Sequence, residues 1–370
     1  MHMQPTINDS ANPTIIGSTR HIADDLDFLA ANLHGKKSRI AEGERLDSLC
    51  RIQNIQELYN NIFPDSEFEG IIDFQRQLII RLIAEISGFC AYMSGAREEL
   101  INWTLIRFQV ENLKILVRSI LTDVPIKQRY EFLIPLPKTL SVDVDRLGSS
   151  ESLEEFVHHM PKGPLRQNLS KAVKIYSDYH RPFFFEAALD CGYFEGLLAK
   201  TKKLPNEDRE IIEKMIFQEV DIFHLMLVAR GRFYYKLPTE VLQPLHIDGT
   251  RITRALFFDM LHDSDPVASI GRASDRVLDS EPFGNETDDG TKTINIPAIE
   301  GQAWGHFLRL SNNAFRRSHM GMGTIMGYIG IRRIEVANLI TISECIRKKM
   351  PVDAIRTRLI PRNSFEVAYV

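Results

Sequence analysis

The chain has 370 residues, of which 44% are hydrophobic and 25% are charged. This balance is typical of a soluble globular protein with a sizeable core, and the length predicts two or three domains. The formal net charge of −4 excludes a general electrostatic attraction to nucleic acid or to anionic lipid.

The first twenty residues are polar and lack the apolar core of a secretory signal, so we expect none. The most apolar stretch, residues 78–93, is interrupted by Arg81 and Glu85. A membrane span needs about 20 predominantly apolar residues, so this stretch is predicted to be a buried helix. The cysteines are widely separated and form no CxxC pair, which favours a reducing, cytoplasmic compartment. They are Cys50, Cys90, Cys191 and Cys345.

Helical periodicity dominates the rest of the chain, and strand alternation is scarce. Residues 99–121 are predicted to form one helix. Residues 204–230 form a second, with Pro205 near its start and Gly231 just past its end. The long loop candidate is 280–298, which is rich in Gly, Pro, Asp and Thr. The sequence therefore predicts an all-α fold.

A pattern recurs three times along the chain, in QVENL (109–113), DIFHL (221–225) and EVANL (335–339). The Asn or His positions lie 112 and 114 residues apart. In each copy the two polar residues lie on one face of a helix. An apolar residue four positions before the first and another four positions after the second lie on the same face. The paired positions are Gln109 and Asn112, Asp221 and His224, and Glu335 and Asn338.

The segments downstream of these positions also repeat. Pro125 and Pro351 each follow the Asn by 13 residues, and Pro238 follows His224 by 14. Proline suits the first turn of a new helix, so a helix is predicted to begin at each. The tripeptide LIP then occurs at 133–135 and at 359–361.

We interpret the chain as three pseudo-symmetric helical units that pack on each other, because one unit cannot bury its apolar stripe alone. The predicted division is an N-terminal extension at 1–35, then units at 36–140, 141–250 and 251–370, the last containing the loop 280–298.

The glycines of GMGTIMG (321–327) resemble a dinucleotide-binding loop only superficially. That motif needs a preceding strand and the spacing G-x-G-x-x-G, whereas the spacing here is G-x-G-x-x-x-G. A turn that permits close helix packing is the preferred interpretation.

Other candidates for chemistry are weak. His262 and Asp263 could belong to a helical metal-dependent phosphohydrolase, but a metal needs several convergent ligands, which the spacing does not supply. The repeated carboxylate position is Gln109 in one copy, and an amide cannot act as an acid or a base. We therefore expect the repeated polar pairs to be structural, and we expect no catalytic, cofactor or metal site.

Charge is unevenly distributed. Residues 302–370 carry eleven Lys/Arg and four Asp/Glu, whereas residues 259–290 carry nine Asp/Glu and two Arg. Such regions are either solvated faces or surfaces for different partners. The candidate partner-facing basic residues are Arg332, Arg333, Arg347, Lys348 and Lys349.

The residues carry a family resemblance. The stretch 327–361, with its E-x-x-N-L core, resembles the C subunit of the bacterial and archaeal V-type/A-type rotary ATPases, whose eukaryotic counterpart is the d subunit. Residues 195–238 and 102–119 resemble the middle and first copies, and 36–63 resembles the first helical pair. His224 departs from the family pattern, which has Asn there.

The resemblance implies a funnel-shaped, non-catalytic adaptor of the central stalk, peripheral on the cytoplasmic face of the membrane. Its implied partners are the membrane rotor ring and the central shaft, with torque coupling ATP to proton or sodium transport. It implies neither a nucleic acid nor a small-molecule substrate. The sequence lacks the opening that is characteristic of the eukaryotic family members, which favours a bacterial origin. The alternatives are a helical-repeat scaffold unrelated to rotary motors and a metal-dependent phosphohydrolase.

Overall fold

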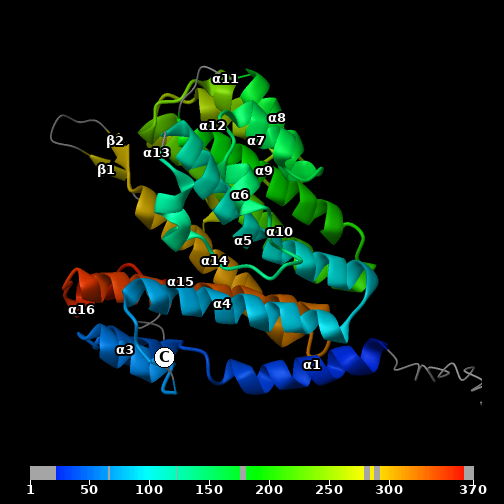
Figure 1. Cartoon of the computed structure of the whole chain (residues 1–370), viewed down its shortest axis with the longest axis vertical. Coiled ribbons are helices and arrows are strands. Elements are labelled where there is room, and N and C mark those ends of the chain that lie inside the picture. The colour runs from blue at the N-terminus through cyan, green and yellow to red at the C-terminus, as the bar shows by residue number, and fades with distance from the viewer. Residues whose placement is uncertain are drawn as a thin grey trace, which may run out of the picture.

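The computed structural model describes residues 22–65, 67–122, 124–175, 181–278, 284–286 and 292–361. The predicted all-α class is confirmed. Within these residues, strand occurs only in an antiparallel hairpin, in which β1 (Gly284–Glu286) pairs with β2 (Lys292–Ile294). The hairpin lies at the edge of the molecule beside α13 (Figure 1).

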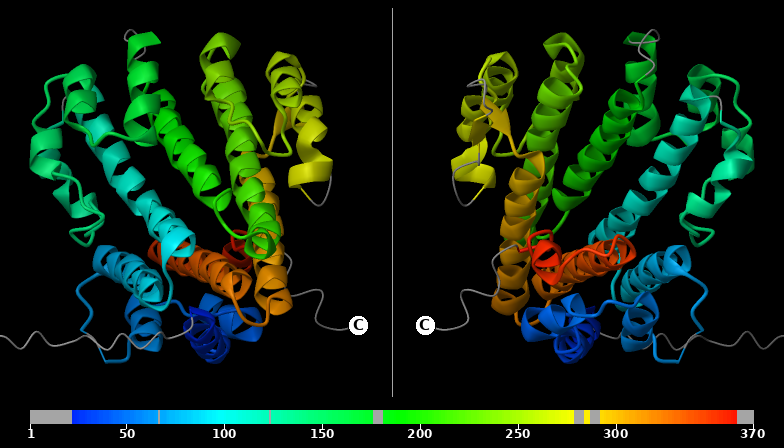
Figure 2. Two further views of the ribbon diagram at one scale, coloured as in Figure 1. Left: turned by 90° about the vertical axis from the view of Figure 1, so that its right-hand side faces the viewer. Right: turned by 90° about the vertical axis from the view of Figure 1, so that its left-hand side faces the viewer.

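Three long helical hairpins form the frame. They are α4 (Ile71–Phe89) with α5 (Gly95–Leu121), α9 (Pro182–Thr201) with α10 (Asn206–Met226), and α14 (Ile296–Arg317) with α15 (Met322–Arg347). The long helices contact one another in the closed order α4, α5, α9, α10, α14, α15 and back to α4. In Figure 2, α5, α9, α10 and α14 fan out from a layer that contains α4 and α15.

Short helices connect and cover these hairpins. Before the first lie α1 (Ile22–Lys37), α2 (Gly43–Cys50) and α3 (Ile55–Ile62), and the 3-10 turn η1 (Cys90–Tyr92) joins α4 to α5. Between the first and second lie η2 (Ile126–Phe132), α6 (Val144–Gly148), α7 (Leu153–His159) and α8 (Pro164–Ile175). After α10 come η3 (Leu227–Tyr234), α11 (Thr239–Leu242), η4 (Gln243–Leu245), α12 (Arg254–His262) and α13 (Pro266–Val277), and α16 (Val352–Arg356) follows α15.

Local sequence signals explain where several helices begin. Pro125, Pro238 and Pro351 each immediately precede a helical segment, as the repeated prolines predicted. The carboxylate of Asp265 accepts hydrogen bonds from the backbone N–H groups of Val267 and Ala268 at the start of α13, so it satisfies two donors that a helix start leaves free.

The apolar stretch 78–93 forms most of α4 and the turn η1. Leu78, Leu82 and Ile86 are buried at a spacing of four residues, so one face of α4 packs into the core. The prediction of a buried helix is confirmed. Among the described residues, no helix combines the length and hydropathy that a membrane crossing requires.

Two predicted boundaries were wrong. The helix expected to stop before Gly231 continues as the π-helix η3 to Tyr234. Gly231 does not end the helix. Its missing side chain lets Leu242 and Phe183 pack against the backbone. The expected loop 280–298 contains the hairpin of β1 and β2, and α14 already begins at Ile296. The side chain of Asn295 caps α14 by accepting from the N–H of Ala298 at 3.0 Å.

The glycines of GMGTIMG serve a turn and close packing, as predicted. Gly321 has φ of 107°, a conformation that favours glycine, and it immediately precedes α15. A Cβ atom on Gly327 would lie 2.6 Å from the Phe315 nitrogen and 2.6 Å from the Ser311 carbonyl oxygen. The absence of a side chain therefore lets α15 pack directly on the backbone of α14.

We predict that Gly327→Ala lowers the free energy of unfolding by about 1–3 kcal/mol, because the new methyl group meets backbone that cannot move aside easily. Chemical denaturation would measure the change. Gly271→Ala, at a position inside α13, is the control, since a Cβ atom there would have no neighbouring atom within 4 Å. The control should stabilise by up to about 1 kcal/mol, and equal effects at the two positions would contradict the packing argument.

Candidate functional site

Asn112 and Asn338 make matching contacts. The side-chain amide of Asn112 donates to the carbonyl of Ile134 at 2.8 Å, and its oxygen accepts from the Ile134 N–H at 2.8 Å. Asn338 does the same with Ile360, at 2.8 and 2.9 Å. Each partner lies 22 residues further along, in the LIP tripeptide. Both Asn side chains thus hold an incoming segment as a strand neighbour would.

His224 fills the same place in the second copy with fewer bonds. Its Nε2 accepts from the N–H of Ile247 at 3.0 Å, 23 residues on, and its Nδ1 has no hydrogen-bond partner. The ring stacks on His246, with centroids 4.7 Å apart and planes at 9°. Burial, with a further contribution from His246, holds the pKa of His224 well below its usual value, so the ring is neutral at pH 7.

The other member of each pair also contacts an incoming segment. Gln109 donates to the carbonyl of Leu140 at 3.1 Å, 31 residues on. Asp221 accepts from the N–H of Ile252 at 3.0 Å, also 31 residues on. Burial raises the pKa of Asp221, although the Ile252 N–H and Arg251, 2.7 Å away, act in the opposite direction.

In the third copy the partner comes from the beginning of the chain. Glu335 accepts from the N–H of Ala41 at 2.6 Å, across 294 residues of sequence. The residues just after Ala41 form α2 and α3, which pack on α16 and α15. A segment that precedes the first hairpin therefore makes with the third hairpin the kind of backbone contact that the downstream segment makes with each of the other two.

A second set of equivalent positions, five residues before the Asn or His, meets at one point. These positions are Arg107, Glu219 and Arg333. Arg333 donates to both Glu219 oxygens at 2.8 Å, and Arg107 donates to one at 3.0 Å. We call this group the central triad. It joins α5, α10 and α15, one helix from each hairpin.

The carboxylate of the central triad is buried, whereas Arg107 extends toward the surface with 30% of its side chain exposed. The Glu219 side chain is 3% exposed, and Arg333 lies over the ring of Phe307, 5.4 Å from its centroid. Burial by itself would raise the pKa of Glu219, but the Arg333 and Arg107 guanidiniums hold it below its usual value. Burial likewise opposes the charge of Arg333, and Glu219 raises the pKa of Arg333 nonetheless. Glu219 and Arg333 therefore remain charged because they are paired.

A third set lies six residues after the Asn or His and links neighbouring hairpins. Arg118 on α5 pairs with Glu186 on α9, and Arg230 on η3, which continues α10, pairs with Glu300 on α14. At the corresponding place on α15, Glu344 accepts from Gln75 of α4 at 2.8 Å. The helix pairs linked in this way are the three inter-hairpin contacts of the closed order.

The structure places Arg332 and Arg333, two of the candidate partner-facing residues, against internal carboxylates. Arg333 belongs to the central triad, and Arg332 contacts Glu85 at 3.1 Å and also pairs with Glu335. Their charges satisfy internal carboxylates, which a count of basic residues along the sequence does not reveal. The remaining candidates, Arg347, Lys348 and Lys349, are exposed. Arg347 is paired with Glu344 at 2.6 Å.

His262 and Asp263, the residues considered as metal ligands, each have other contacts. His262 stacks on Phe258 and contacts its carbonyl oxygen, and Asp263 pairs with Arg272. Among the residues placed in the structure, no three His, Cys, Asp or Glu side chains are arranged to hold a metal ion.

The chain is similar in sequence to known proteins over most of its length. A model of the family described as "ATP synthase (C/AC39) subunit" matches residues 29–358. The chain belongs to this family. Three A-type ATP synthase C subunits are similar to it over most of both chains. That of Methanosphaera stadtmanae is 20% identical over 338 residues, covering 89% of this chain and 86% of the relative.

The C subunit of Methanocaldococcus jannaschii is 20% identical over 344 residues, covering 90% of this chain and 86% of the relative. That of Pyrococcus horikoshii is 19% identical over 341 residues, covering 88% of each. The C/AC39 membership confirms the resemblance and makes the chain part of a rotary ATPase. These relatives are archaeal, and the expected bacterial origin stays a prediction.

We predict that Glu219→Gln lowers the free energy of unfolding by about 3–5 kcal/mol, because the mostly buried Arg333 and the partly exposed Arg107 would both lose their carboxylate. Urea denaturation would measure the loss. Glu210→Gln, at an exposed position of the same helix, is the control and should change stability by less than about 0.5 kcal/mol. A loss below about 1 kcal/mol in Glu219→Gln would contradict a structural role for the central triad.

The depressed pKa of His224 predicts that the folded protein loses stability in acid. Its pKa is depressed in the folded chain, so the unfolded chain binds more protons below about pH 6.5. Its contribution to stability is therefore complete well above that pH and is lost as the pH falls through about 6.5. We expect unfolding midpoints between pH 8 and 5.5 to fall less in His224→Asn than in the wild type. His158→Asn, at an exposed position, should keep the wild-type pH dependence, and an unchanged slope in His224→Asn would refute this assignment.

Proposed function

We propose that the chain is a non-catalytic adaptor of the central stalk, linking the central shaft to the membrane rotor ring and transmitting torque. Family membership supports an assignment to a rotary ATPase, and the relatives are named as C subunits of A-type ATP synthases. In this proposal the protein is peripheral on the cytoplasmic face of the membrane. ATP turnover on other subunits is coupled through it to proton or sodium transport.

The observation that carries the proposal is the closed set of equivalent contacts among the three hairpins. The positions at −5, −3, 0 and +6 relative to the repeated Asn or His each make inter-segment contacts in all three copies. We infer from them a pseudo-threefold funnel with units at 36–140, 141–250 and 251–370. Such an arrangement presents similar surfaces around one axis, which suits contact with a rotating shaft.

Torque transmission requires that the three units move as one body. The central triad couples α5, α10 and α15 directly, because one carboxylate is shared by two guanidiniums from different helices. The +6 contacts couple each hairpin to the next. A load on one hairpin therefore reaches the others through paired interior groups and packed helices.

Partner surfaces are proposed separately. The exposed cations Arg347, Lys348 and Lys349 at the end of α15 are candidates to face an acidic partner or the phospholipid surface. Such contacts would weaken with salt, since exposed charges are screened over about 8 Å at physiological ionic strength. Neither a nucleic acid nor a small-molecule substrate is part of this proposal.

Reconstitution tests the function. Vesicles that contain the motor without this chain should hydrolyse ATP but not transport ions, because the shaft would turn without its link to the ring. Adding the purified chain should restore transport, measured with an ion-sensitive dye beside an ATPase assay. Fully coupled transport in its absence, or ATPase activity of the chain alone, would overturn the adaptor proposal.

A further inference from the structure

Exposed apolar side chains are concentrated on two elements. Among the described residues, eight large hydrophobic side chains are exposed, and half of them belong to α4 or to η2. They are Ile72 and Ile80 of α4 and Tyr130 and Phe132 of η2. Single exposed apolar residues need no explanation, but several of them around one groove often mark a binding surface.

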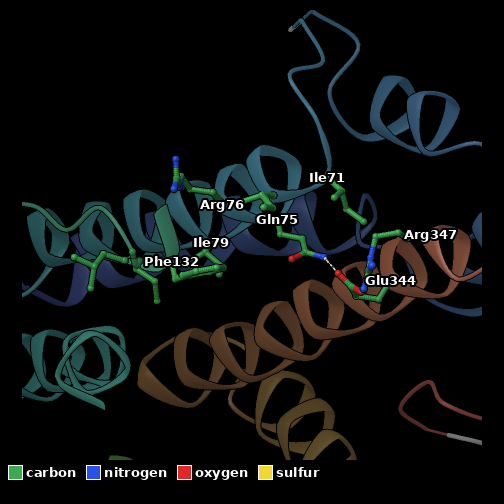
Figure 3. Close-up of a pocket in the computed structure, with 10 residues that line it drawn as sticks. Ile71, Gln75, Arg76, Ile79, Phe132, Glu344 and Arg347 are labelled. Carbon is green, nitrogen blue, oxygen red and sulfur yellow. Dashed lines mark hydrogen bonds and ion pairs between the residues drawn. The ribbon is translucent and has the colours of Figure 1, made fainter. Parts of the chain in front are cut away.

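A groove of about 400 Å³ lies between α4, η2 and the end of α15 (Figure 3). We call it the α4–α15 groove. Ile72 and Phe132 line it and are 49% and 56% exposed, and Ile79 lines it further along α4. Ligand-binding clefts have volumes of about 300–1,000 Å³. The groove is therefore large enough to receive a bulky side chain of another molecule.

The sequence of α4 explains why apolar side chains face outward here. Ile72, Arg76 and Ile79 follow the spacing i, i+4 and i+7, so they lie on one face of the helix. Phe74 and Leu78 lie on the opposite face and are buried in the core. A surface helix usually has one apolar face and one polar face. In α4 the second face combines isoleucine with arginine, which is typical of a contact surface.

A polar network fixes one edge of the groove. The Gln75 side chain donates to the Glu344 carboxylate at 2.8 Å and to the Ser343 hydroxyl at 3.0 Å. Arg347 donates to the same carboxylate at 2.6 Å. These contacts tie α4 to α15 beside the groove. The groove is therefore formed before any ligand enters, as binding clefts usually are.

The groove and its surroundings are positively charged. Arg76 and Arg347 line it together with Glu344, whose charge is already offset by Arg347. Lys348 and Lys349 follow at the end of α15, and both are exposed. Such a surface attracts carboxylates and repels cations. The ligand that fits therefore carries negative charge beside its apolar part.

We propose that the α4–α15 groove binds a segment of another protein in which an aromatic or aliphatic side chain stands next to carboxylates. The apolar side chain enters between Ile72 and Phe132, and the carboxylates contact Arg347 and the lysines that follow it. A phospholipid surface is flat and meets the cations without entering a groove between helices, so the recessed apolar wall favours a protein. The proposal deepens the partner surface described above, and it rests on the adaptor function for the place of that partner in a rotary ATPase.

Binding of a defined peptide to the full-length chain is the first test. The probe is a blocked pentapeptide with tryptophan between two pairs of glutamates. In a chain with labelled isoleucine methyl groups, the peptide should shift the NMR signals of Ile72 and Ile79, and the shifts should saturate. Exchanging the glutamates for lysines, or the tryptophan for glycine, should weaken binding by about tenfold or more. No saturation by the acidic tryptophan peptide up to about 5 mM, or equal binding of the three peptides, would overturn the proposal.

Two matched pairs of variants locate the site. Ile72→Ser should weaken peptide binding by about fivefold or more, because apolar contact area is lost. Ile80→Ser, on the same helix but outside the groove lining, should leave binding within about twofold of the wild type. Arg347→Gln should weaken binding by about threefold or more, whereas Lys214→Gln, at an exposed position of α10, should not. Melting curves verify that each variant is folded, and equal effects within either pair would contradict the assignment.

Vesicles distinguish a protein partner from a lipid surface. Ile72→Ser should not change the fraction of the chain that sediments with vesicles of phosphatidylserine and phosphatidylcholine. Vesicle binding that is lost in both Ile72→Ser and Arg347→Gln, without peptide binding to the wild type, would assign the groove to lipid and overturn the proposal. These assays need neither ATP nor another subunit. Their failure would leave the adaptor proposal standing, and failure of the reconstitution would leave the groove as a peptide-binding site.

Discussion

The structure depends on one buried carboxylate shared by two guanidiniums. Apolar packing alone would hold the helices together but would specify their relative heights poorly, since Leu and Ile side chains pack in many registers. Glu219 contacts Arg107 and Arg333 from separate hairpins, so a shift of one helix by a turn would leave a charge inside the protein unpaired. The free-energy cost of that state is comparable to that of a large packing defect, and we infer that it helps to fix the register of all three helices.

Periodicity and spacing predicted much of the fold. The all-α class, the buried α4, the helical segments after Pro125, Pro238 and Pro351, and the packing role of Gly327 all follow from local patterns. The π-helical continuation past Gly231 did not, because a glycine that ends a helix and one that permits close packing look alike in sequence. The prediction of a loop at 280–298 was also wrong, because short strands such as β1 and β2 carry little periodic signal in the sequence.

The central triad was missed for a chemical reason. A search for repeats compares residue types, and the three equivalent positions hold Arg, Glu and Arg. They need opposite charges because they touch one another, so similarity was the wrong criterion. The available signal was complementary charge at a constant offset from Asn112, His224 and Asn338. The same oversight placed Arg333 among partner-facing residues, and the partner of Glu335 was hidden because Ala41 lies 294 residues away.

The polar contacts at the centre and between the hairpins differ in how they hold the ring. At the centre, the Glu219 carboxylate is buried and paired with two guanidiniums, so salt screens it little. Between hairpins the contacts lie nearer the surface: Arg118 pairs with Glu186 and Arg230 pairs with Glu300, whereas Gln75 donates to Glu344. The central carboxylate therefore ties all three hairpins at one point, and the outer contacts add links between neighbours.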